Sequence, residues 1–376
     1  MKKIAILVFF TVGFFVHVWA CTGLIAGKQA TVDGSVLVTY SADSHTLYGA
    51  LTSSPAADWP KGSMRSIVEW DTNKPLGEIE QVEHTYAVMG NMNEHQLTVV
   101  ESTWGGRPDL VDTTGIIDYG SLMQLALERA KTAREAIKVM TGLVKKYGYY
   151  SSGESFTIAD PNEAWILDLI GKGPGRRGAV WVAVRIPDDC IAGHANYPRI
   201  HKIPMDDKEN CLYSPDVISF AREMGYFDGL NKDFSFARAY SPADFGALRA
   251  CDARVWSFFR KYDSTMDNYL PYVNGESAEP FPLYVKPSRK LSVQDMKEAM
   301  RDHFEDTPFD MTQDVGAGPF KVPYRFRPMS FEVDGKSYCM ERAIATQQTG
   351  FTLVGQMRNW LPDPVGGVLW FGVDDA

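Results

Sequence analysis

The sequence has no basic excess, because its 376 residues carry 38 Lys and Arg against 47 Asp and Glu, a formal net charge of -9. A protein that binds nucleic acid normally carries surplus positive charge, so we predict no nucleic-acid partner. The apolar content is not low either: 45% of residues are hydrophobic and 12% aromatic, which excludes a disordered chain. The length suits one large or two ordinary domains with a sizeable core.

Metal and cofactor motifs are also lacking. His194 and His201, separated by six residues, match no common metal spacing, and no paired Cys spacing indicates zinc, so we expect ordinary polar or core-edge histidines and no metal. Gly173-Pro-Gly-Arg-Arg-Gly178 matches the dinucleotide fingerprint, but a helix should follow it and a strand is expected instead. We predict a hairpin loop there and no cofactor. Gly153-Glu-Ser155 lacks the Gly-x-Ser-x-Gly elbow of serine hydrolases.

Long apolar runs are absent except at the start of the chain. Two lysines precede an apolar run from Ile4 to Val18, which is too short for a comfortable membrane span and is typical of a secretory signal peptide. Val18 and Ala20 stand at the -3 and -1 positions, where signal peptidase requires small residues. We therefore expect residues 1–20 to be a signal peptide cleaved after Ala20, residues 21–376 to be the mature domain, and the protein to be exported to the periplasm or the extracellular medium.

This cleavage would make Cys21 the first mature residue, which allows two interpretations. In one, Cys21 is acylated and anchors a lipoprotein to a membrane; Trp19 at the -2 position and a strand pattern that starts at Thr22 without a tether disfavour it. In the other, Cys21 is a nucleophile and its own free α-amine is the base. The unperturbed pKa values are near 8 for the amine and about 8.5 for the thiol, so proton transfer is almost isoenergetic.

A hairpin is expected just after Cys21, where Asp33-Gly34 separates two strand patterns, Thr22–Val32 and Ser35–Ser41. If these two residues form the loop, Leu24 pairs with Asp43. Cys21 then lies three residues beyond Leu24, about 10 Å along the strand. A bulge or a curled end would be needed to bring Cys21 and Asp43 together.

Strands and helices fall in separate blocks. Further strands are expected at 83–89, 96–103, 155–159, 165–170, 180–185, 190–195 and 368–373. Helices are expected at 119–130, after Thr132 with a capping box, from Ser214 to about Met224, and from Ser292 to His303. Such blocks indicate α+β layers rather than alternating βαβ units.

Four cysteines besides Cys21 leave the redox state open. Cys190, Cys211, Cys251 and Cys339 could form two disulfides in an oxidising compartment, in any of three pairings, or remain four buried thiols.

Several motifs together resemble the bacterial dipeptidase A family of N-terminal-nucleophile cysteine hydrolases and, more distantly, the penicillin and bile-salt amidases. The matches run in order from Cys21 to Trp370, nearly the whole mature chain. The motifs that carry them are Cys21-Thr-Gly-Leu-Ile-Ala-Gly-Lys-Gln-Ala-Thr-Val-Asp-Gly-Ser35, Ala42-Asp-Ser44, Asn93-Glu-His95, Glu101-Ser-Thr-Trp-Gly-Gly106, Gly153-Glu-Ser-Phe-Thr-Ile-Ala-Asp-Pro-Asn-Glu-Ala-Trp165 and Trp181-Val-Ala-Val-Arg-Ile-Pro187. The resemblance implies a four-layer αββα fold, short peptides as substrates and no cofactor. An N-acyl amidase using the same site is the alternative that it leaves open.

The resemblance also implies roles for five residues. Cys21 would be the nucleophile, and Asp43 the carboxylate that orients its amine. Asn196 matches an Asn near the amine and the oxyanion, Thr103 falls where the amidases place an oxyanion-hole Asn, and Arg254 matches an Arg near the nucleophile. Asp43 also suits a turn cap, and Asn196 a loop position.

Two departures from the family are visible. Relatives often carry an Arg shortly before the Asp, where this chain has Tyr40, so a charge that could act on the thiolate or the substrate is missing. The family also usually continues well beyond the last residue here, so we expect a domain shortened at its C-terminus.

Overall fold

The computed structural model describes residues 21–44, 48–325 and 330–374. The expected signal peptide, residues 1–20, lies outside the described residues and stays a prediction. Within these ranges, no helix is both long and apolar enough to cross a membrane.

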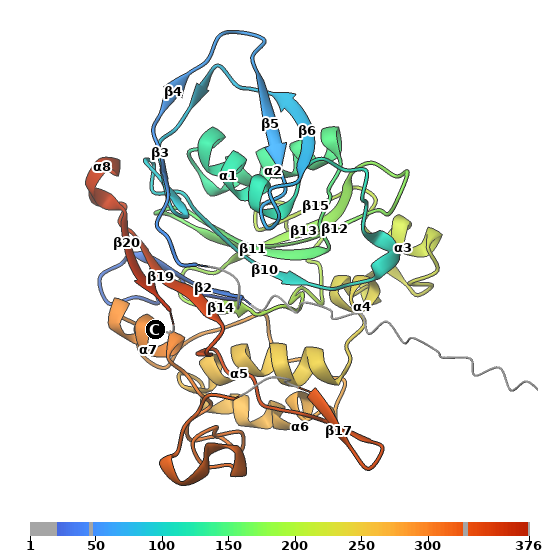
Figure 1. Ribbon diagram of the computed structural model, residues 1–376, viewed down its shortest axis with the longest axis vertical. Helices are drawn as coiled ribbons and strands as arrows, with labels where there is room; N and C mark the ends of the chain where they lie inside the picture. The colour runs from blue at the N-terminus through green and yellow to red at the C-terminus, as the bar shows by residue number, and fades with distance from the viewer. Residues whose placement is uncertain (1–20, 45–47, 326–329, 375–376) are drawn as a thin grey trace, which may run out of the picture.

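Two antiparallel sheets form the centre of the molecule (Figure 1). The first has six strands, in the order β16 (Tyr284–Val285), β14 (Ile191–His194), β1 (Thr22–Ala26), β2 (Val36–Asp43), β19 (Thr349–Met357) and β20 (Val368–Val373). The second has eight, in the order β15 (Cys211–Tyr213), β13 (Ala179–Ile186), β12 (Ala164–Gly171), β11 (Gly153–Ala159), β10 (Thr98–Trp104), β9 (Met92–Asn93), β8 (Val88–Met89) and β3 (Ser53–Ser54).

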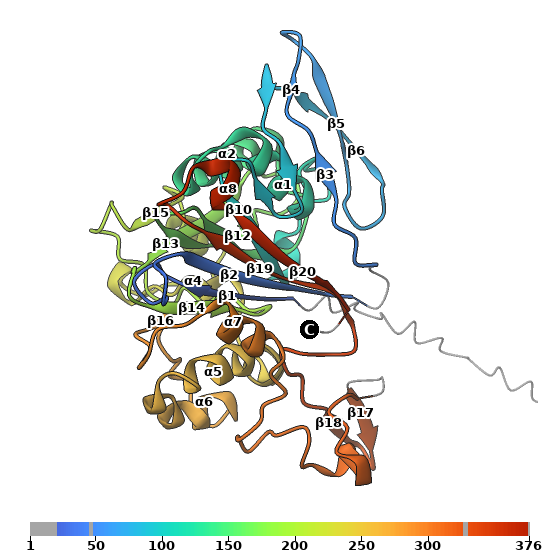
Figure 2. The same ribbon diagram turned by 90° about the vertical axis from the view of Figure 1, so that its left-hand side faces the viewer.

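Helices cover the outer face of each sheet. The eight-stranded sheet packs against α1 (Tyr119–Arg129) and α2 (Ala133–Tyr147), and the six-stranded sheet against α5 (Ala253–Arg260) and α7 (Val293–Met300), as Figure 2 shows edge-on. The remaining helices are short: α3 (Ser219–Glu223), α4 (Phe236–Tyr240), α6 (Leu270–Val273) and α8 (Asp363–Gly366). The predicted α+β class and the four-layer αββα sandwich are confirmed.

Three small two-stranded sheets lie outside the sandwich. They pair β4 (Ala57–Asp58) with β7 (His84–Thr85), β5 (Met64–Val68) with β6 (Pro75–Glu80), and β17 (Ser330–Val333) with β18 (Lys336–Cys339). The first two form an arm beside α1, seen at the top of Figure 1.

Each interface between layers has its own apolar core. Side chains such as Val38, Val100 and Ile166 fill the space between the two sheets. Leu24 and Trp256 belong to the core between the six-stranded sheet and its helices. A third core, with members such as Phe156 from β11 and Leu122 from α1, joins the other sheet to its helices. Alternate residues of one strand therefore enter different cores, which fixes the register because a one-residue slip would reverse the faces.

The expected starts of α1, α2 and α7 are correct, but α7 is shorter than expected and the helix expected from Ser214 starts later. The Thr132 hydroxyl caps α2 by accepting the Glu135 N–H, and Ser292 with Asp295 forms a complete capping box at α7. α7 ends at Met300 because Arg301, with ψ 7°, already leaves helical geometry. The helix expected after Ser214 spans only Ser219–Glu223.

The predicted two-residue hairpin at Asp33-Gly34 is wrong in its register. Leu24 pairs with Thr39, not with Asp43, and the connection runs from Gly27 to Ser35. The connecting residues also bond to distant segments: the Gln29 N–H donates to the Asp188 carbonyl, 2.8 Å, and the Val32 N–H to the Leu291 carbonyl, 3.0 Å. These long-range partners replace the ladder that the local turn signal predicts.

Other local predictions agree with the structure. The glycine-rich segment 173–178 is the loop between β12 and β13, and the pattern at 368–373 is strand β20. Cys190, Cys211 and Cys251 are free thiols. The side chain of Cys339 lies outside the described part of the chain.

Candidate active site

Cys21 lies at the start of β1, between the two sheets, and only 4% of its surface is exposed. Tyr40 of β2 contacts it, with the hydroxyl oxygen 3.7 Å from Sγ. The observed register places Tyr40 opposite Gly23, so its ring reaches diagonally back toward Cys21. The family's Arg position, which carries Tyr here, is therefore in contact with the candidate nucleophile.

Arg254 of α5 joins the strand carrying Cys21 to the loop after β14. One of its terminal nitrogens, Nη1, donates to the Cys21 carbonyl and to the Thr22 hydroxyl, both at 2.8 Å. The other, Nη2, donates to the Ala195 carbonyl, 3.0 Å, and to Asn196 Oδ1, 2.8 Å. Since the side chain is fully buried, this planar donor group holds both segments in a fixed relation.

Asn196 is held on three sides in a left-handed backbone conformation, with φ 58°. Its Oδ1 accepts from Arg254, its Nδ2 donates to the Thr103 carbonyl at 2.5 Å, and its backbone N–H donates to the Ser102 hydroxyl at 3.2 Å. Only Asn, Asp and Gly adopt this conformation readily. The sequence-predicted Cys21, Arg254, Asn196 and Thr103 are thus brought together by a continuous set of hydrogen bonds.

The Thr103 side chain, however, is engaged elsewhere. Its hydroxyl donates to Glu154 Oε2, 3.0 Å, across the β10–β11 pair. On the same face, Glu101 accepts a short hydrogen bond from the Tyr40 hydroxyl. Thr103 therefore contacts Asn196 through its backbone carbonyl, and its hydroxyl is directed to a buried carboxyl pair.

Asp43 is close to Cys21 through its backbone rather than through its carboxylate. Its backbone amide hydrogen-bonds the thiol, whereas its carboxylate forms an ion pair with Arg342 and accepts from the Thr349 hydroxyl at 2.7 Å. The irregular pairing of β2 with β19 near Thr349 accommodates this contact. No sequence pattern identified Arg342, because it lies 299 residues from its partner.

The thiol is held protonated in this environment. Burial, followed by the charges of Glu101 and Asp43, raises the pKa of Cys21 well above its ordinary value, and the hydrogen bonds from Asp43 and Tyr40 only partly oppose this. A thiolate would therefore form only if a base removes the proton as the sulfur attacks.

His194, the histidine nearest to these residues, has both ring nitrogens engaged. Nδ1 is 2.6 Å from the Ser102 hydroxyl and Nε2 is 2.8 Å from the Thr157 hydroxyl, and the ring is fully buried. It joins the two sheets through these two hydroxyl groups. Among the residues that the structure describes, no group of three or more His, Cys, Asp or Glu could hold a metal ion.

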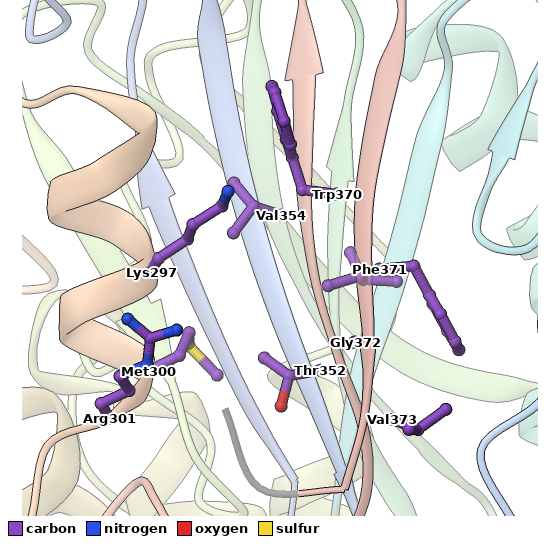
Figure 3. Close-up of a pocket in the computed structure, with 10 residues that line it drawn as sticks. Lys297, Met300, Arg301, Thr352, Val354, Trp370, Phe371, Gly372 and Val373 are labelled. Atoms are coloured by element: carbon purple, nitrogen blue, oxygen red, sulfur yellow. The ribbon is translucent and has the colours of Figure 1, made fainter.

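Two cavities lie away from this site. One, of about 320 Å³, is a groove between α7 and the strands β19 and β20, and Figure 3 shows Lys297 and Trp370 on its two sides. Lys297 Nζ is 4.1 Å from the centre of the Trp370 ring, so the groove is bridged by its own side chains. The other, of about 1040 Å³, is lined by residues such as Arg199, His201 and Phe281. Cys21 lines neither.

Comparison with known proteins identifies the family. The sequence model that describes peptidase family C69 matches residues 20–376 of this chain. The chain belongs to peptidase family C69. It is therefore a cysteine-type peptidase, a hydrolase of peptide bonds, and the resemblance to the dipeptidase A family is confirmed.

Curated relatives match most of this chain at low sequence identity. The "Probable dipeptidase" of Salmonella dublin is 28% identical over 318 residues, 77% of this chain and 68% of the relative. The "Probable dipeptidase" of Latilactobacillus sakei is 25% identical over 377 residues, 94% of this chain and 71% of the relative. "Dipeptidase A" of Lactobacillus helveticus is 24% identical over 372 residues, 93% of this chain and 72% of the relative.

The sequence did not reveal the contact of Tyr40 with Cys21. It also gave no role to Glu101, Glu154 or Arg342 of this C69 peptidase. A signal for the two glutamates exists: each is a charged residue inside a buried strand pattern, in the motifs that start at Glu101 and Gly153. A buried charge in a strand usually has a partner or a function.

Proposed function

We propose that this C69 peptidase is an exported cysteine dipeptidase, in which Cys21, freed by cleavage after Ala20, is the nucleophile. The observation that carries this is the set of hydrogen bonds from Arg254 to both Cys21 and Asn196, which fixes the start of β1 beside a side-chain amide. The names of the relatives from Salmonella dublin and Lactobacillus helveticus support dipeptides as the substrate class.

Attack requires a base, because the buried thiol keeps its proton. In the cleaved chain the Cys21 α-amine takes that proton, directly or through one water, as Sγ bonds to the scissile carbonyl carbon. The carbonyl oxygen then carries the negative charge, and backbone N–H groups with Asn196 Nδ2 stabilise it. Losing one such donor typically costs about 100- to 1000-fold in rate.

Collapse of this intermediate breaks the C–N bond, and the α-ammonium group returns its proton to the leaving amine. A thioester on Cys21 remains. The same amine then deprotonates a water molecule, which attacks the thioester and releases the acid and the thiol. This sequence is proton-balanced and requires no further reactant beyond water.

Substitution of Cys21 tests the proposal. Cys21→Ala in the cleaved protein should abolish dipeptide turnover, measured by release of free amino acids. Cys190→Ala, which removes the buried thiol just before β14, at the end of that strand away from Cys21, should keep it. Full turnover by cleaved Cys21→Ala would refute the mechanism.

Mass spectrometry of the exported protein tests the free amine. A mature chain that begins at an unmodified Cys21 is expected. A lipid adduct on Cys21 would block both the amine and the thiol, and would establish the lipoprotein interpretation instead.

A further inference from the structure

Glu101 and Glu154 form a carboxyl pair inside the protein. They lie on the adjacent strands β10 and β11, with Glu154 opposite Thr103, so both side chains point to the same face of the sheet. Glu101 is 2% exposed and Glu154 is 0% exposed. Within the described ranges no Lys or Arg forms an ion pair with either carboxyl group, and the two carboxyl groups share a side-chain hydrogen bond.

The two carboxyl groups oppose each other's ionisation. Burial raises the pKa of Glu101 and raises that of Glu154 further, because the charge of Glu101 opposes the ionisation of its neighbour. Glu101 therefore ionises before Glu154, and the two groups together resist carrying two negative charges. An unpaired buried charge is costly, so this arrangement suits a ligand that brings one positive charge.

The pair lies next to the nucleophile. Tyr40 connects them, because its hydroxyl is 3.7 Å from Cys21 Sγ and donates to Glu101 Oε1. Two successive hydrogen-bond lengths place this carboxylate within about 7 Å of the sulfur.

We propose that Glu101, supported by Glu154, binds the α-ammonium group of the substrate's N-terminal residue, so that the enzyme selects peptides with a free amine. This inference rests on the proposed function, which places the first carbonyl carbon of the peptide at Cys21. In a peptide, the α-nitrogen is about 2.5 Å from that carbon, and attack occurs at about 3 to 3.5 Å. The ammonium group then lies no more than about 6 Å from Sγ, so it and the Glu101 carboxylate occupy the same surroundings of the sulfur.

A requirement for a free α-amine would separate this protein from an N-acyl amidase. An acylated peptide has no cationic nitrogen at this position, so it would leave the Glu101 charge unpaired and bury an amide against it. The acylated peptide should therefore bind more weakly than the free peptide, because only the free peptide brings a positive charge to Glu101.

Binding to the cleaved Cys21→Ala protein tests this without turnover. Titration calorimetry should give alanyl-alanine a dissociation constant about 10- to 100-fold lower than that of N-acetyl-alanyl-alanine, as expected for a hydrogen bond to a charged group. Equal affinities would overturn the inference. Equal affinities would not bear on the Cys21 mechanism, because this binding measurement involves no catalysis. Failure of the Cys21 mechanism would appear only in the activity assay.

Variants assign the preference to the carboxyl pair. In the same Cys21→Ala background, Glu101→Gln should weaken binding of the free dipeptide about 10- to 100-fold and leave the N-acetyl form unchanged. Glu154→Gln should cause a smaller loss, because the Gln amide can still donate to Glu101 as the protonated Glu154 does. Glu83→Gln, at an exposed position before β7, is the matched control with no expected change.

A Glu101→Gln protein that keeps the full preference for the free amine would contradict the assignment. Its thermal unfolding is measured in parallel. If that variant does not fold, the comparison of the free and N-acetylated dipeptides on the Cys21→Ala protein still decides the inference.

Discussion

At the scale of single residues, His194 shows how burial changes an ordinary side chain. Its ring crosses between the sheets, and a Cβ on Gly23 would lie only 2.9 Å from it. Burial, with a smaller effect from the charge of Arg254, lowers the pKa of His194 to about 3 from its ordinary 6.5. A histidine in this position is a neutral structural group at physiological pH and is unavailable as the base.

This predicts a specific acid sensitivity. Between pH 6.5 and 3 the unfolded chain binds a proton on His194 that the folded chain does not, so the free energy of unfolding falls as the pH falls. The contribution is about 1.4 kcal/mol per pH unit. His194→Gln keeps a donor and an acceptor but cannot titrate. The free energy of unfolding of this variant, measured by urea denaturation, should therefore change less with pH between 6 and 4. The slope should be smaller by about 1.4 kcal/mol per pH unit.

His201 provides a parallel test. Burial and the nearby Arg199 and Arg238 lower its pKa to about 3 as well, so His201→Gln should reduce the pH dependence similarly.

If His194→Gln unfolds with the same pH dependence as the unchanged protein, His194 is protonated in the folded state and the prediction is wrong.

At the scale of elements, two helical glycines differ in their surroundings. Gly142 lies on the exposed face of α2 with nothing within 4 Å of a Cβ built on it. Gly120 of α1 lies against the arm, where a Cβ would be 2.5 Å from Trp70 Cγ. Only the second glycine is required by packing.

Substitution by alanine should therefore have opposite effects at the two positions. Gly142→Ala should stabilise the protein by about 0.5–1 kcal/mol, since alanine loses less backbone entropy in a helix. Gly120→Ala should destabilise it by about 1–3 kcal/mol through overpacking. Urea denaturation of both variants measures the difference, and equal effects would show that the arm does not pack on α1 in this way.

At the scale of the whole molecule, the Asp43–Arg342 pair joins the second strand to a segment near the end of the described chain. Both side chains are buried, with 1% and 6% exposed. Removing one partner of a buried ion pair leaves the other charge uncompensated, at a cost of about 3–5 kcal/mol. This contact therefore holds β2, and with it Tyr40, in the register that the site requires.

Arg342→Met should lower the free energy of unfolding by about 3–5 kcal/mol. The matched control is Arg289→Met, which removes a more exposed ion pair to Asp295 with the Arg side chain 58% exposed and should change stability by about 1 kcal/mol or less. Equal losses in the two variants would contradict the assigned importance of the Asp43 pair.

The sequence by itself determined the elements and the family. Apolar alternation and capping residues predicted β10 to β13, α1 and α7, because these signals act over a few neighbouring residues. The ordered motifs from Cys21 to Pro187 identified the relatives, and the family match confirms them.

Only the tertiary structure decided the register after Cys21 and the surroundings of the thiol. Leu24 pairs with Thr39 because the connecting loop bonds to distant segments, which a local turn signal does not encode. Likewise, Tyr40 meets Glu101 from the opposite sheet, across 61 positions of sequence. Contacts between distant segments depend on how whole layers pack, and for that reason the carboxyl pair beside Cys21 was found only in the folded chain.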